Sequence, residues 1–201
     1  MYKALAAIIF VAISLTGCGS MRLVDTEVRS FATPPAMPAG ATYRFERLPS
    51  QQVDTGRQDK LEAMAQPALA KAGLKRDDRA PSHSVQVTYG MKIDAHAPWE
   101  QPEPWGWNLG WGIGWGGRGG SLVLGGGAPF GNLASSPYYW RQISLVMRSL
   151  ATNQVVYETR ATHDGRWADT EAVLPALFEA ALKDFPNPPA GVRRINIEIP
   201  R

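Results

Sequence analysis

The stretch SVQVTYGMKIDA, residues 84–95, alternates apolar and polar side chains without a break. Every second position is apolar, and these positions are Val85, Val87, Tyr89, Met91, Ile93 and Ala95. Successive side chains of a strand point to opposite faces, so this period of two predicts a strand with one buried face. Such a strand is stable only within a sheet whose apolar face is covered by another layer.

Weaker alternation predicts further strands on both sides of this one. They occupy residues 23–31, 42–48, 142–148, 155–161 and 192–199. The runs 142–148 and 155–161 flank a short connection, and we expect them to form an antiparallel hairpin.

Two segments change to helical spacing. The first begins near residue 55 and ends at Gly73, where a left-handed cap is expected. The second begins at Asp169 or Thr170 and ends at the proline cluster 186–189. Together these patterns predict an α+β fold: an antiparallel-rich sheet of about five to six strands with both helices packed on one face.

Composition limits the class of protein. The chain has 201 residues, of which 44% are hydrophobic and 19% charged, as expected for one folded domain. A net charge of +3 with scattered basic residues gives no stripe for nucleic acid, so we expect no nucleic-acid partner. A single cysteine excludes an internal disulfide and a cysteine-based metal cluster within the chain.

The amino terminus has the layout of a secretory signal. Lys3 precedes an apolar run over residues 4–15, which is too short to span a bilayer as a helix. The run ends in Leu15-Thr16-Gly17-Cys18, which resembles the lipobox of bacterial lipoproteins. We therefore expect a signal peptide over 1–17, a lipidated end and short tether over 18–22, and one α+β domain over 23–201. The alternative is a secreted protein or an uncleaved anchor with a chance cysteine.

The resemblance to lipoproteins also implies a location. Cys18 would carry acyl chains, for example palmitate, that bind the lipid bilayer stably. Aspartate after the modified cysteine commonly retains such proteins at the inner membrane, and this chain has Gly19 there. We expect the periplasmic face of the outer membrane, with the inner membrane as the alternative.

A segment rich in glycine and tryptophan, residues 98–137, is predicted to be a flexible insertion. Between residues 105 and 115, large apolar side chains alternate with glycine or asparagine, so an extended chain would place them on one face. These side chains are Trp105, Trp107, Leu109, Trp111, Ile113 and Trp115. They form either a strip that contacts lipid, an envelope protein or a glycan, or a mobile cover for the open sheet face.

Few residues suggest catalysis or metal binding. Asp94 and His96 share the polar face of the strand that begins at residue 84, and His163 lies at the end of the predicted hairpin. They could hold a metal or exchange protons if their strands were neighbours, which is the basis of the alternative function, a small periplasmic enzyme or metal-binding protein. Polar side chains on the surface at strand ends explain the same residues. We predict no catalytic site, no metal site and no cofactor.

The order of several short motifs resembles the lipoprotein family named domain of unknown function 4136. These are the lipobox, Thr42-Tyr43-Arg44-Phe45, Lys71-Ala72-Gly73-Leu74, the strand 84–91, the glycine and aromatic stretch, the hairpin and LFEAALKDFP at 177–186. The chain departs from the family pattern at Ser144 and Ser149, where acidic residues are common, and at Tyr157, where tryptophan is common. The resemblance implies an envelope lipoprotein with no agreed activity and a structural, binding or accessory role.

Overall fold

The computed structural model describes residues 21–34, 37–38, 40–94, 97–99 and 137–200. Their strands form one sheet of seven, in the order β3-β2-β4-β5-β6-β1-β7. The strands are β1 (Met21–Ala32), β2 (Thr42–Phe45), β3 (Lys75–Arg76), β4 (His83–Asp94), β5 (Tyr138–Ser149), β6 (Val155–Gly165) and β7 (Val192–Pro200). The helices are η1 (Pro49–Gln52), α2 (Thr55–Lys71) and α3 (Thr170–Leu182).

The sheet is mixed. β4, β5, β6, β1 and β7 pair antiparallel in that order, whereas β2 pairs parallel with both β3 and β4. The segment β2-α2-β4 is thus a crossover connection between parallel strands. The predicted hairpin is confirmed as β5 and β6.

The prediction of five to six strands is wrong, because the sheet has a seventh, β3. This strand has only two residues, both exposed, so it carries no alternation. It follows the end of α2, where Gly73 adopts a φ of +87° and Leu74 N donates a hydrogen bond of 3.0 Å to Leu69 O. This left-handed end of the helix turns the chain back toward β2.

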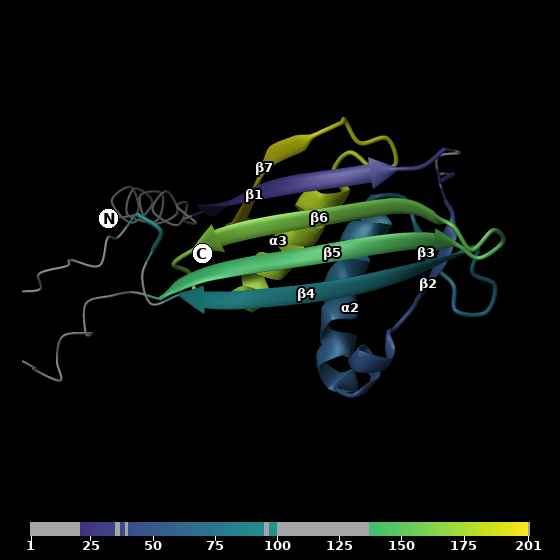
Figure 1. Cartoon of the computed structure of the whole chain (residues 1–201), viewed down its shortest axis with the longest axis horizontal. Helices are drawn as coiled ribbons and strands as arrows, with labels where there is room; N and C mark the ends of the chain where they lie inside the picture. Colours follow the sequence, from purple (N-terminus) through teal and green to yellow (C-terminus); the bar gives the residue numbers. More distant parts are fainter. Residues whose placement is uncertain (1–20, 35–36, 39, 95–96, 100–136, 201) are drawn as a thin grey trace, which may run out of the picture.

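Both α helices cover the same face of the sheet, as predicted, and lie behind it in Figure 1. The core between the two layers combines the alternate apolar residues of the strands with one side of each helix. Its members with no exposed surface include Ala65, Leu69, Val173, Leu177, Phe178, Val85, Val87, Ile143, Leu145, Met147, Ala161, Val24 and Val28. Neither helix of the described part of the chain is long and apolar enough to cross a membrane.

Candidate functional site

Several residues singled out in the sequence lie outside the described residues. They are the lipidation candidate Cys18, the alternative ligand His96 and the whole predicted contact strip: Trp105, Trp107, Leu109, Trp111, Ile113 and Trp115. The glycine-rich insertion is thus not confirmed.

Asp94 and His163 do not come together. β4 and β5 pair Asp94 with Tyr138, while β5 and β6 pair Arg141 with His163. Tyr138 and Arg141 are an odd number of residues apart, so they and their partners point to opposite faces of the sheet. Asp94 instead forms an ion pair of 3.0 Å with Lys92. Within the described ranges, no group of three or more histidine, cysteine or acidic side chains could hold a metal ion.

Arg141 and His163 form a buried polar cluster beneath the start of α3. They lie opposite each other on the helix-covered face, with 1% and 5% of their surfaces exposed. Arg141 Nε donates a hydrogen bond of 3.0 Å to Thr170 Oγ1, and Arg141 Nη2 donates one to the Trp167 carbonyl. Because both acceptors lie where α3 begins, the guanidinium fixes the start of that helix.

His163 is a structural side chain in this cluster. Its Nδ1 lies 2.7 Å from the carbonyl oxygen of Asp25, so Nδ1 carries the proton and donates it. Burial lowers the pKa of His163, and the nearby Arg141 lowers it further. The neutral ring keeps its Nε2 buried without a hydrogen-bond partner among the described groups. A base in this position has no route for taking a proton from a substrate.

Trp167 covers the cluster. Its ring stacks on His163 with centroids 6.1 Å apart, and the guanidinium of Arg22 lies 5.0 Å from its centroid. Arg22 also pairs with Asp169, the residue that precedes α3. The interpretation of His163 as a surface residue at a strand end is therefore wrong.

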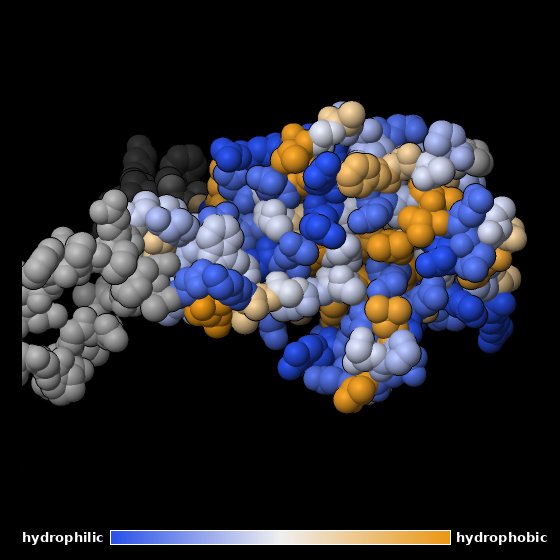
Figure 2. Space-filling model, viewed as in Figure 1, coloured by the Kyte–Doolittle hydropathy of each residue, from blue (hydrophilic) through white to orange (hydrophobic). Residues whose placement is uncertain are grey.

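The face of the sheet opposite the helices is not covered by any described element. Most of its side chains on the central strands are partly or fully exposed, with Ser84 and Tyr138 as buried exceptions, and Figure 2 shows this face as mainly hydrophilic with scattered apolar side chains. One row crosses four strands here: Thr88, Ser144, Arg160 and Arg29 lie opposite one another in turn. We call this side of the sheet the open face.

Arg29 and Arg160 are neighbours on the open face without a carboxylate partner. They are directly paired across β1 and β6, and neither forms an ion pair within the described structure. The guanidinium of Arg29 lies 5.2 Å from the ring centroid of Phe31, which is 53% exposed. Two like charges placed opposite each other destabilise a sheet, and Glu27 and Glu158, two positions away on the same face, offset part of this repulsion. An acidic group bound between the two guanidinium groups would offset more of it.

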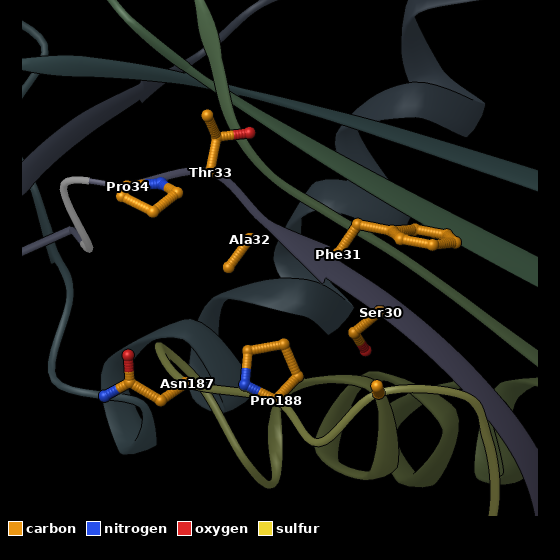
Figure 3. Close-up of a pocket in the computed structure, with 8 residues that line it drawn as sticks. Ser30, Phe31, Ala32, Thr33, Pro34, Asn187 and Pro188 are labelled. Carbon is orange, nitrogen blue, oxygen red and sulfur yellow. The ribbon is translucent and has the colours of Figure 1, made fainter.

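An open groove lies where β1 ends. Ser30, Phe31, Ala32, Thr33 and Pro34 line one side, and the loop after α3 contributes Asn187, Pro188 and Ala190 on the other (Figure 3). Its volume is about 370 Å³. No titratable side chain lines it, and the Ser30 hydroxyl is already bonded to Thr159 at 2.7 Å and Arg193 at 3.1 Å. The groove therefore offers no acid or base, and its hydroxyl groups belong to Ser30 and Thr33.

Sequence reasoning missed Arg141 and the pair of Arg29 and Arg160. The signal for Arg141 was present, because it shares the alternation phase of Ile143 and Leu145 and so belongs to the apolar face. No comparable signal marks Arg29 and Arg160, since their pairing depends on β1 lying beside β6.

Comparisons with known proteins give a matching family and one structure of similar fold. The family described as Domain of unknown function (DUF4136) matches residues 28–187. No curated protein matches the chain. A PDZ domain protein from Parabacteroides distasonis is 11% identical with a TM-score of 0.51, over 93% of this chain and 41% of that one. The chain thus spans less than half of that protein, and the likeness concerns the fold alone.

Two dodecamer structures of PelC from Paraburkholderia phytofirmans are also similar. Both are 13% identical to this chain, with TM-scores of 0.41 and 0.42. The matches cover 78% and 77% of this chain and 94% and 95% of the PelC chains.

Proposed function

The chain belongs to the DUF4136 family, and on that premise we propose that it is a lipid-anchored accessory protein of the bacterial envelope that acts by binding. Acyl chains on Cys18 hold it at the periplasmic face of the outer membrane. Its partner is a second envelope protein that presents acidic groups to the open face.

The position of β1 supports the anchor. β1 begins at Met21, and only Gly19 and Ser20 separate it from Cys18 in the sequence. Three residue steps span at most about 10 Å, so an acylated Cys18 would keep the folded part against the bilayer. Two or more acyl chains make such an anchor stable.

The observation that carries the binding role is the pair of Arg29 and Arg160 on the open face. The two exposed arginines are paired across adjacent strands beside the exposed ring of Phe31, and Glu27 and Glu158 lie two positions away on the same face without forming an ion pair with them. Arginines and an aromatic ring are typical anchors of protein interfaces. Catalysis is a poorer explanation, because Asp94 and His163 point to opposite faces and His163 Nε2 is buried.

Metabolic labelling tests the anchor. Radiolabelled palmitate should enter the full-length chain in cells and should not enter the Cys18→Ser variant. Equal labelling of both chains, or labelling of neither, would disprove the anchor.

Site-specific crosslinking in intact cells tests the open face. A photo-crosslinking residue at the exposed position Gln142 should capture a defined partner, and one at the exposed Lys60 on α2 should not. The Arg29→Glu/Arg160→Glu variant should abolish the crosslink. A matched double reversal on α2, Arg57→Glu/Lys60→Glu, should leave it intact.

Three results would overturn the binding proposal. They are no defined product at Gln142, a product that survives reversal of Arg29 and Arg160, and an equal product at Lys60. A product that is removed by glycosidase and not by protease would instead assign the open face to a glycan, and the protein partner would be wrong.

A further inference from the structure

The end of the sheet nearest Cys18 carries an unusual set of exposed apolar side chains. β1 begins there and pairs Met21 with Pro200, the last residue of β7. β4 ends there and β5 begins there, since Asp94 pairs with Tyr138. In Figure 1 this end lies on the left, where β4 ends and β5 begins.

Six of the twelve large apolar side chains that are exposed in the described ranges lie at this end. They are Met21, Leu23, Met91, Ile93, Trp99 and Trp140, with exposed fractions of 51%, 46%, 47%, 54%, 65% and 39%. We call these six residues the apolar rim. Both tryptophans among these twelve exposed side chains belong to the apolar rim.

The aromatic part of the rim is ordered. Trp99 meets Tyr138 edge to face with ring centroids 5.2 Å apart, and Tyr138 meets Trp140 in the same way at 5.5 Å. Tyr138 itself is buried, and its hydroxyl donates to a carboxylate oxygen of Asp164. The two exposed indole rings are therefore held in place by a buried tyrosine.

The rim surrounds the end of the sheet on both faces. Met91 and Ile93 belong to the helix-covered face, where the hydroxyl of Thr170 reaches the sulfur of Met91 at 3.7 Å. Met21 and Leu23 alternate with the buried Val24 and so belong to the open face. A protein partner bound to either face would cover only part of this rim, whereas a lipid surface against the end would cover all of it.

Three carboxylates at this end are paired, whereas Glu198, opposite Leu23, is exposed and forms no ion pair with another described residue. Asp94 is bound by Lys92, Asp164 by the hydroxyl of Tyr138, and Asp169 by Arg22. Pairing lowers the cost of moving carboxylates toward a region of low dielectric constant. Tryptophan favours the boundary between lipid and water, where its ring is buried and its N–H stays hydrated.

From this arrangement we infer that the apolar rim inserts into the interfacial region of the bilayer, so that the sheet stands end-on on the membrane. The inference rests on the proposed acylation of Cys18, which would hold Met21, the first residue of the rim, within about 10 Å of the anchored residue. The open face then extends away from the membrane and remains free for a partner.

A fluorescent probe at two matched positions tests the insertion. One cysteine replaces Ile93 in the rim (Ile93→Cys), and the other replaces Phe31 (Phe31→Cys) near the end of β1 that is distant from the rim. The native side chains are 54% and 53% exposed, so the two positions are matched in exposure. Met21 and Phe31 on β1 are about 33 Å apart, from ten residue steps of about 3.3 Å. Acylation blocks the thiol of Cys18, so the introduced cysteine is the only one that a thiol-reactive NBD fluorophore can label.

The labelled, acylated chain is reconstituted into protein-free vesicles of phosphatidylethanolamine and phosphatidylglycerol. NBD at position 93 should emit at shorter wavelength than NBD at position 31, and doxyl groups near the lipid headgroups should quench it severalfold more strongly. Replacing Trp99 and Trp140 with serine should weaken that quenching. Equal emission and quenching at the two positions would overturn the inference.

The result separates the two proposals. If palmitate does not label Cys18, the anchor is wrong. If palmitate labels Cys18 and NBD at position 93 stays in water, the rim inference alone is wrong. Protection of position 93 in native envelopes but not in protein-free vesicles would assign the rim to a protein interface and would also overturn the inference.

Discussion

Replacement of Arg47 tests the ion pair that joins the segment after β2 to α2. Arg47 donates two hydrogen bonds of 2.6 Å to the two carboxylate oxygens of Glu62, whose side chain is 4% exposed. Glu62 keeps one further bond, of 3.2 Å, from Gln58 Nε2. Arg47→Met would therefore leave a buried carboxylate with one neutral donor. Breaking a buried pair in this way costs about 3–5 kcal/mol.

We expect a value near the lower limit, about 3 kcal/mol, because 27% of the Arg47 side chain is exposed and water reaches the vacated position. With a urea dependence of about 2 kcal/mol per molar, the midpoint of denaturation should fall by roughly 1.5 M. The measurement uses a chain that starts at residue 18 with Cys18→Ser, followed by circular dichroism.

Two controls make this prediction specific. Arg57→Met removes an exposed partner of Asp54 on the same helix, where both side chains are more than half exposed, and should cost less than about 0.5 kcal/mol. The double variant Arg47→Met/Glu62→Met removes both charges and should recover most of the loss. The reasoning is refuted if Arg47→Met costs no more than Arg57→Met, or if the double variant is as unstable as the single one.

Three further predictions concern the core, the end of α2 and the buried histidines. Phe178→Ala should lower the free energy of unfolding by about 3–5 kcal/mol, since the side chain is fully buried; a loss below about 1 kcal/mol in urea would contradict this packing. Gly73→Ala should destabilise the folded chain by about 1–2 kcal/mol because of the φ of +87°. Gly56→Ala should stabilise it by about 0.5–1 kcal/mol, because the added Cβ meets nothing within 4 Å. Melting temperatures that shift in the same direction in both variants would contradict these two predictions. Burial lowers the pKa of both His163 and His83, so the unfolded chain takes up protons first and stability should fall as the pH drops below about 6.5. Urea midpoints at neutral and mildly acidic pH measure this loss of stability. His163→Gln should make the midpoint depend less on pH. A midpoint that rises on acidification would contradict the prediction.

Local patterns predicted most of the secondary structure. The alternation of Ile143, Leu145 and Met147 and the spacing of Leu61, Ala68 and Leu69 are properties of neighbouring residues, so they locate β5 and α2 without knowledge of the fold. The same patterns could not give β3, which exists because residues 75 and 76 meet β2. They also could not give the parallel pairing of β2, since both parallel and antiparallel strands alternate.

The candidate surfaces were harder to predict, because each depends on contacts between distant segments. Ile93 follows the same alternation as Val85 and Val87, yet it is exposed where Val85 is fully buried. The difference arises because the helical layer does not extend over the end of β4. Likewise, Arg29 and Arg160 are ordinary polar positions of two strands until the pairing of β1 with β6 places them side by side.

The location of β1 between β6 and β7 sets the order in which this chain can fold. Every strand that pairs with β1 begins at residue 155 or later, and the registered pairs include Glu27 with Thr162 and Met21 with Pro200. The strand that is synthesised first must therefore remain without neighbours until the C-terminal strands are available. Closing contacts of such long sequence separation is slow. A nascent chain thus keeps its first strand without sheet partners, and the sheet closes around that strand only after the C-terminal strands have been synthesised.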